Sequence, residues 1–311
     1  MDLITWQQSG KTFPYNNYQI FYQDAGQGDV LLCIHGFPTS SWDWHCLWPN
    51  LTSKFRAIAP DMIGFGFSDK PYHYHYSIHD QATLLQNLLH SIAVKSIHIL
   101  AHDYGVSVAQ ELLARYEHRK KLQTDTIDTI GEIDKMDTIN SINEIDGIEI
   151  KSICFLNGGL FPETHRPRFI QKLLLSPIGF LLTYLTNQKS FNRSFAAIFG
   201  TDSKPSDKEL NDFWFIVNHK NGLKISHKII HYITERKHFR SRWVGVLQQT
   251  NVPLRLIIGA LDPVSGEHMA VRYKDLIPNP DIILLPTIGH YPQVEDPDSV
   301  WLAFLFFSQH F

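Results

Sequence analysis

Short runs of apolar residues alternate along this chain with longer segments whose apolar residues have helical spacing. Two such helical segments are residues 78–92 and 106–116. This alternation is typical of an α/β fold in which helices cover both faces of a mostly parallel central sheet. The apolar runs, each predicted to be a strand, are residues 18–23, 30–34, 56–59, 96–101, 153–156, 254–258 and 282–285.

The alternation stops between residues 160 and 245, where the chain is rich in aromatic residues and interrupted by Pro162, Pro167, Pro177 and Pro205. It resumes at Leu254, so the sheet-forming core is discontinuous in sequence. A length of 311 residues suits one large domain with an insertion. We therefore predict a core of residues 1–159 and 246–311 and an inserted helical cap of residues 160–245.

A second unusual segment, residues 127–148, has an apolar residue at every third position, separated by Asp, Thr, Asn and Glu. A period of three fits neither an α-helix nor a β-strand. We interpret residues 121–150 as a low-complexity surface insertion with no part in chemistry. A surface for a binding partner is the alternative interpretation.

Charge and composition exclude some classes of function. The net charge of −3, from 28 basic and 31 acidic residues without a basic block, argues against a nucleic-acid partner. Cys33 and Cys154 lie in apolar runs and are expected to be free thiols of a reducing compartment. Residues 1–11 lack the features of a secretory signal, and no apolar run approaches a membrane span of about 20 residues. We expect a cytoplasmic protein without a transmembrane segment.

Residues 97–105 place a predicted strand directly before a small-x-Asp-x-Gly turn and a helix. Such a nucleophile elbow needs small residues, here Ala101 and Gly105, so that the central side chain, Asp103, projects above the sheet. The positive end of the following helix stabilises negative charge there. Taken alone, Asp103 could equally be a helix N-cap.

A second loop supports the elbow. The strand at residues 30–34 ends in His35-Gly-Phe-Pro, where the backbone N–H of Phe37 can form an oxyanion hole with the N–H of Tyr104. We expect His35 itself to be a buried brace of the loop.

Two later residues follow predicted strands: Asp262, which precedes Pro263, and His290, one of 17 histidines. Alone, they could be a turn residue and a chance histidine. In the order Asp103, Asp262, His290 they match the nucleophile, acid and histidine of a catalytic triad.

These stretches resemble the epoxide hydrolase and haloalkane dehalogenase branch of the α/β-hydrolase superfamily. The specific matches are residues 35–41 (HGFPTSS), 64–71 (GFGFSDKP), 102–105 (HDYG), 157–167 (NGGLFPETHRP), 242–245 (RWVG) and 290–297 (HYPQVEDP).

The resemblance implies an α/β-hydrolase fold with a helical cap, in which Asp103 attacks, His290 activates water, Asp262 orients His290, and Phe37 and Tyr104 donate backbone N–H groups. A carboxylate nucleophile forms an alkyl ester that water then hydrolyses. The expected partners are a small apolar substrate and water, no metal or organic cofactor is needed, and the oligomeric state stays undefined.

The chain also departs from its relatives. Related dehalogenases hold the halide with an Asn at the position of Phe37 and a Trp at that of Tyr104. Epoxide hydrolases use cap tyrosines, but Trp243 stands near the usual position, which leaves Tyr184 and Tyr232 as candidate acids. We favour an epoxide-hydrolase-like enzyme; a haloalkane dehalogenase, another ester-type hydrolase and a non-catalytic binding protein of the same fold remain as alternatives.

Overall fold

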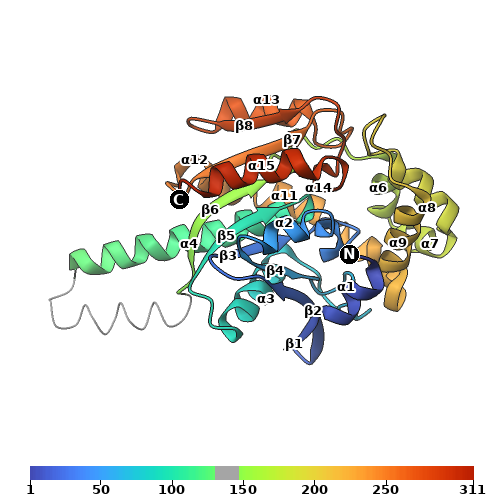
Figure 1. Cartoon of the computed structure of the whole chain (residues 1–311), viewed down its shortest axis with the longest axis horizontal. Helices are drawn as coiled ribbons and strands as arrows, with labels where there is room; N and C mark the ends of the chain where they lie inside the picture. Colours follow the sequence, from blue (N-terminus) through green and yellow to red (C-terminus); the bar gives the residue numbers. More distant parts are fainter. Residues whose placement is uncertain (130–146) are drawn as a thin grey trace.

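The computed structural model describes residues 1–129 and 147–311, and its centre is a twisted sheet (Figure 1). In these residues the sheet has eight strands in the order β1-β2-β4-β3-β5-β6-β7-β8. The pairs β1–β2 and β2–β4 are antiparallel, and all others are parallel. The strands are β1 (Lys11–Tyr15), β2 (Tyr18–Ala25), β3 (Val30–Ile34), β4 (Arg56–Pro60), β5 (Ser96–Ala101), β6 (Glu149–Phe155), β7 (Leu254–Gly259) and β8 (Asp281–Leu285).

All seven predicted strands are present, and two of them, β3 and β5, have the predicted bounds. The sequence prediction missed β1, which contains Pro14 and in which most residues are exposed. Pro14 is compatible with this strand because β1 lies at the edge of the sheet and pairs only with β2.

Helices cover both faces of the sheet and bury an apolar core on each. One core includes residues of α3 (Ile78–Ser91), α4 (Tyr104–Thr129), α12 (Arg240–Gln249) and α13 (Glu267–Leu276). The other includes residues of α1 (Leu3–Ser9), η1 (Ser41–Trp44), α2 (Trp48–Thr52), α14 (Pro292–Glu295) and α15 (Pro297–Ser308). Their packing holds the carboxyl ends of the parallel strands in place, where the candidate site lies.

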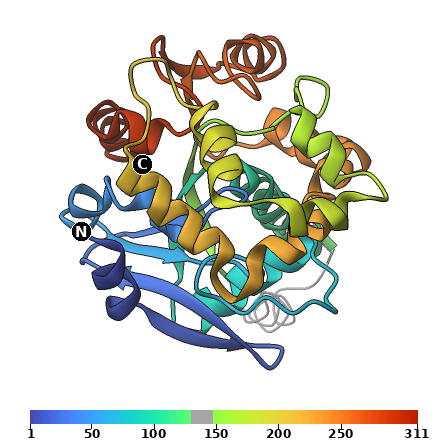
Figure 2. The same cartoon turned by 90° about the vertical axis from the view of Figure 1, so that its right-hand side faces the viewer.

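Between β6 and β7 the chain forms a series of short helices that gather at one end of the molecule (Figures 1 and 2). We call residues 169–229 the helical insertion. It comprises α6 (Phe169–Leu174), α7 (Gly179–Leu185), α8 (Gln188–Ala196), α9 (Asp207–Asn218), η2 (His219–Ile225) and α10 (Ser226–Ile229), and α11 (Tyr232–His238) leads back to the core.

The predicted cap boundary at residue 245 falls inside α12, which packs against α4. Trp243 is buried there, and its indole N–H donates to Glu111 of α4 at 2.8 Å. By packing, α12 therefore belongs with the core helices, and Trp243 lies away from the site.

The predicted insertion at residues 121–150 overlaps α4, which continues to Thr129, and β6, which begins at Glu149. Ile148, the last residue of the three-residue repeat, is buried in the core. Residues 130–146, and with them most of the repeat, lie outside the described residues. Within the described residues, no helix combines the length and apolar character needed to cross a membrane.

Candidate active site

Asp103 occupies a tight turn between the end of β5 and the start of α4. Its φ of 43° lies in the left-handed region, which costs a non-glycine residue of order 1–3 kcal/mol. Gly105 makes the turn possible, because a Cβ there would lie 2.4 Å from the carbonyl oxygen of Ile34. Asp103 is 4% exposed. The turn thus has the strained geometry expected of a nucleophile elbow.

The loop after β3 lies directly beside this carboxylate. The N–H of Phe37 donates to Oδ2 of Asp103 at 3.1 Å. Gly36 permits the approach, because a Cβ there would lie 2.9 Å from Cβ of Asp103. His35 braces the loop as predicted: it is fully buried, its Nδ1–H donates to the carbonyl of Gly36 at 2.8 Å, and its Nε2 accepts from the N–H of Met62 at 3.1 Å.

Tyr104 is the first residue of α4, so its N–H lies at the positive end of that helix. No described residue accepts a hydrogen bond from this N–H. Its ring is buried against Phe65 and Tyr232. Tyr104 can therefore contribute its backbone, but not its side chain, to an anion-binding site.

His290 and Asp262 form a buried pair near Asp103. Nδ1 of His290 lies 2.7 Å from Oδ2 of Asp262, and both side chains are nearly inaccessible. Asp262 also accepts from the N–H of Val264 at 2.7 Å and from the N–H and hydroxyl of Ser265 at 3.1 and 2.6 Å. These donors keep Asp262 in one orientation, so it fixes the His290 ring with Nε2 free.

Electrostatic interactions favour the charged forms of both members of this pair. Burial opposes the charge on Asp262, but the charge and hydrogen bond of His290 and the donors around the carboxylate hold its pKa well below the usual range. Burial alone would lower the pKa of His290, whereas Asp262, Asp103 and Glu295 raise it, and the balance is a pKa of about 9. At neutral pH the ring is therefore an imidazolium between carboxylates.

Two buried residues connect the parts of the site. The backbone carbonyl of Asn157 accepts from the N–H of Asp103 at 2.8 Å, and its side-chain amide donates to Asp262 at 2.9 Å. Nε2 of His102 lies 2.8 Å from the carbonyl of His290. Asn157 and His102 therefore couple the nucleophile elbow to the acid and to the histidine loop.

Arg236 of α11 lies at the site, although the sequence did not indicate it. It is 1% exposed, its Nη2–H donates to the carbonyl of Asp103 at 2.8 Å, and Nη2 lies 3.8 Å from Oδ1 of the same residue. Its Nε–H donates to Ser107 at 2.6 Å. Arg236 stands next to Lys237 and His238 in a segment with ordinary helical spacing. No signal in the sequence therefore separates it from cations on the surface.

His165 was also missed as a site residue, although it lies in a stretch that carried the resemblance. Both of its ring nitrogens are buried, and neither has a hydrogen-bond partner among the described residues. Burial and the charge of Arg236 lower the pKa of His165 to about 4, against the opposing charges of Asp103 and Asp262. His165 is therefore a neutral ring close to Asp103 and His290.

The two candidate tyrosines differ. Neither tyrosine is among the residues that line the cavity, but Tyr184 is also 65% exposed, which places its side chain away from the site. Tyr232 is buried, its ring contacts those of Phe37 and Tyr104, and its hydroxyl has no described partner. Burial and the charge of Asp103 raise the pKa of Tyr232, so it keeps its proton.

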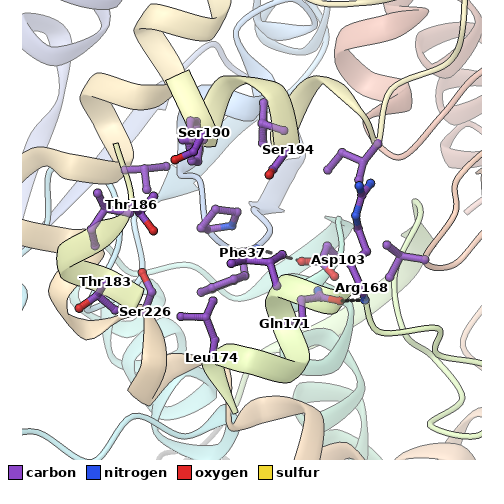
Figure 3. A pocket seen from close by; sticks show the side chains of 18 of the residues that line it. Phe37, Asp103, Arg168, Gln171, Leu174, Thr183, Thr186, Ser190, Ser194 and Ser226 are labelled. Carbon is purple, nitrogen blue, oxygen red and sulfur yellow. Dashed lines mark hydrogen bonds between the residues drawn. The ribbon is translucent and has the colours of Figure 1, made fainter. Parts of the chain in front are cut away.

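A cavity of about 190 Å³ opens above Asp103 and His290, between the core and the helical insertion (Figure 3). Most of its wall is apolar and includes Leu174, Phe191, Phe195, Ile198, Val217 and Leu223. Hydroxyl groups interrupt this wall at Thr183, Thr186, Ser190, Ser194 and Ser226. The arrangement suits a mainly apolar molecule with a few polar atoms.

Comparison with known proteins identifies the family of this chain. It is 40% identical over 323 residues to the mesoderm-specific transcript homolog protein of Homo sapiens, covering 99% of this chain and 88% of that protein. The chain belongs to the α/β-hydrolase fold family. The model of that family matches residues 29–140, and a putative hydrolase, LipZ, of Mycobacterium tuberculosis is 31% identical over 94% of this chain and 93% of its own.

Solved structures of α/β-hydrolase fold proteins are similar over nearly their whole length. A haloalkane dehalogenase variant from Bradyrhizobium elkanii has a TM-score of 0.74 at 18% identity, covering 97% of this chain and 96% of its own. The epoxide hydrolase CorEH has a TM-score of 0.67 at 18% identity, covering 97% and 98%. At this identity they show the shared fold, which confirms the fold predicted from the sequence; the relatives above confirm the predicted family.

Proposed function

We propose that this α/β-hydrolase fold protein is a hydrolase in which Asp103 is the nucleophile and His290, oriented by Asp262, activates water. One observation carries the proposal: Asp103, which is buried and has a strained backbone, lines the same apolar cavity as His290. A hydroxyl or thiol nucleophile is replaced here by a carboxylate, which attacks an sp³ carbon to form an alkyl ester. The favoured substrate is an epoxide of an apolar small molecule.

In the first step, Oδ1 of Asp103 attacks the epoxide carbon while Oδ2 stays on the N–H of Phe37. The C–O bond of the ring breaks, and its electron pair goes to the ring oxygen, which takes a proton. Arg236, whose Nη2 lies 3.8 Å from Oδ1, places a positive charge beside the attacking carboxylate.

Tyr232 is the side chain that we assign to donate this proton. It is protonated, its hydroxyl has no described partner, and the charge of Asp103 acts on it directly. Tyr184, which is exposed, does not fit this role.

In the second step, esterification has removed the charge of Asp103, which is one of the charges that raise the pKa of His290. The pKa of His290 therefore falls, and its proton passes to the phenolate that Tyr232 became in the first step, so the neutral ring can take a proton from water. The hydroxide attacks Cγ of Asp103, and negative charge develops on the oxygen that already accepts from Phe37. Each N–H in such a site is worth about 3 kcal/mol of transition-state stabilisation. Collapse of this intermediate breaks the bond between Cγ and the alkyl oxygen, which takes the proton from His290 and leaves as the second hydroxyl of the diol, and the carboxylic acid of Asp103 then returns its proton to His290.

The test is intact-mass spectrometry of the His290→Gln variant after incubation with a panel of epoxides, haloalkanes and esters. Loss of the base should trap the alkyl ester, and peptide mapping should place it on Asp103. Asp103→Asn is the matched control and should stay unmodified. An adduct on another residue, or none with an inactive wild type, would contradict the proposal.

Isotope labelling separates this mechanism from direct attack of water on the substrate. In single turnover in H₂¹⁸O, the label should enter the carboxylate of Asp103 and not the product, because water attacks Cγ of the ester. Label in the product alone would contradict a nucleophilic role for Asp103.

Two alternatives receive less support. A haloalkane dehalogenase needs side-chain N–H donors for the halide, but Phe37 has none and the ring of Tyr104 is buried in the core. A non-catalytic binding protein would suit an Asp103 sealed away from His290, whereas both line one cavity. The substrate panel distinguishes all three.

We also propose that the helical insertion acts as a cap, within the predicted range 160–245. Val217, Leu223 and Ser226 of the insertion face Asp103 across the cavity. A cap that closes over the ester would keep bulk water away from it. Hydrogen exchange should be faster in α6–α10 than in the sheet, and equal protection of both would contradict a moving cap.

A further inference from the structure

The outer side of the helical insertion carries an unusual number of exposed apolar side chains. Among the described residues, seven of the eighteen large apolar side chains that are exposed lie between residues 169 and 185. We call this cluster the α6–α7 face, and six of its members are Phe169, Ile178, Phe180, Leu181, Tyr184 and Leu185, with exposed fractions from 44% to 75%. Clusters of this kind mark sites of interaction, because water disfavours a large apolar patch.

The segment of chain that carries this face has charged residues of one sign. Residues 164–201 contain five Lys or Arg residues and no Asp or Glu. Lys172, Lys189 and Arg193 are exposed, and none of them pairs with a carboxylate in the described part of the chain. Lys224 lies over the ring of Tyr184 at 5.8 Å and adds to the same surface.

The α6–α7 face also borders the entrance of the cavity. Ile170, the seventh exposed apolar residue, is 37% exposed and lines the cavity, as does Arg168 (Figure 3). The helices lie at the end of the molecule opposite the protruding end of α4 (Figure 1). A flat partner can therefore approach this face without contacting the rest of the fold.

The geometry points to a docking surface for an anionic lipid membrane, with the side chains of the α6–α7 face inserted among the lipids and the surrounding cations at the headgroups. Short amphipathic helices with aromatic and aliphatic side chains beside Lys and Arg bind membranes in this way. A protein partner is less suited, because protein interfaces are depleted in Lys. This inference goes beyond the proposed chemistry and does not depend on it.

Co-sedimentation of the whole protein with vesicles tests the inference. The protein should bind vesicles of equal parts phosphatidylcholine and phosphatidylserine more tightly than vesicles of phosphatidylcholine alone. A Lys172→Gln, Lys189→Gln, Arg193→Gln variant should bind the anionic vesicles roughly 100-fold more weakly, since each cation near such a surface contributes about fivefold. Added salt should weaken the binding of the wild type.

The apolar part needs its own variants. Leu181→Ser with Leu185→Ser should lower vesicle binding at least about tenfold, because two exposed leucines lose their insertion. The matched control is Leu284→Ser with Leu302→Ser, whose side chains are 41% and 66% exposed elsewhere, against 48% and 74% for the test pair. The control should bind as the wild type does.

A charge control completes the design: Lys54→Gln, Lys95→Gln and Lys274→Gln change the net charge equally at exposed positions away from the face. Equal losses in test and control variants, absence of vesicle binding, or self-association through the face in place of vesicle binding would each overturn the inference. His290→Gln should bind vesicles like the wild type, so a failure of the proposed chemistry would be seen separately.

Discussion

Replacement of Asp262 by Asn removes one charge while keeping nearly the same shape. In the wild type, Oδ1 accepts from the N–H of Val264, and Oδ2 accepts from Ser265, Asn157 and His290. The amide nitrogen of an Asn can take the position of either Oδ1 or Oδ2, and at both positions it would face hydrogen-bond donors. The Oδ1 position has fewer donors than the Oδ2 position. We therefore expect it there, which leaves the N–H of Val264 unpaired at a cost of about 1–3 kcal/mol.

The larger effect concerns His290. Its pKa of about 9 depends first on Asp262, and burial acts in the opposite direction. Without that carboxylate the pKa should fall below the ordinary 6.5, a loss of at least about 3 kcal/mol of preference for the imidazolium. Hydrolysis of the ester should slow on the order of 10⁴-fold, as when the orienting carboxylate of a Ser-His-Asp triad is replaced.

NMR titration of the His290 ring measures the first effect, and mass spectrometry of accumulated ester on Asp103 measures the second. Asp275→Asn, at an exposed position on α13, is the control and should change neither. A pKa that stays near 9 in the Asp262→Asn variant would refute the electrostatic reasoning. Unchanged turnover together with a lowered pKa would refute the assigned role of the pair.

Three further results are expected. Arg236→Met should lower the free energy of unfolding by about 3–5 kcal/mol in urea titrations, since it leaves buried acceptors unpaired, whereas Lys237→Met at the exposed neighbouring position should stay within about 0.5 kcal/mol. Tyr232→Phe should slow ester formation by 10²–10⁴-fold, a typical range for general acids, with unchanged stability; an unchanged rate would exclude it as the acid. Because the folded-state pKa of His290 is raised, its stabilisation of about 3 kcal/mol is complete below pH 6.5 and is lost as the pH rises through about 9, and the His290→Gln variant should lack this loss in unfolding titrations.

Several features could be predicted from the sequence because they depend on neighbours along the chain. The strands β3 and β5 have their predicted bounds, since short, mainly apolar runs of this length are typical of buried strands. The close turn at Asp103 follows from Gly105, whose missing Cβ is a local property. His35 was predicted as a brace because it follows a buried strand.

Other features could not be predicted from the sequence because they depend on contacts between distant segments. The sequence did not distinguish Tyr184 from Tyr232, because both belong to short helices whose burial depends on what packs against them. Tyr184 faces outward, while Tyr232 lies against Phe37 and Tyr104 of the core. The predicted cap boundary at residue 245 falls inside α12 for the same reason, because α12 packs against α4, which lies over 100 residues earlier in the chain.

The sequence by itself determined the seven predicted strands, the close turn at Asp103 and the chain order of the proposed triad, because periodicity, small residues and short motifs act locally. Only the tertiary structure decided that Arg236 is buried against Asp103 and that the apolar side chains of α6 and α7 stay exposed. The physical reason is that the burial of a side chain depends on surfaces brought together by folding. In the sequence, a residue type looks the same whether its side chain becomes buried or stays exposed in the folded protein.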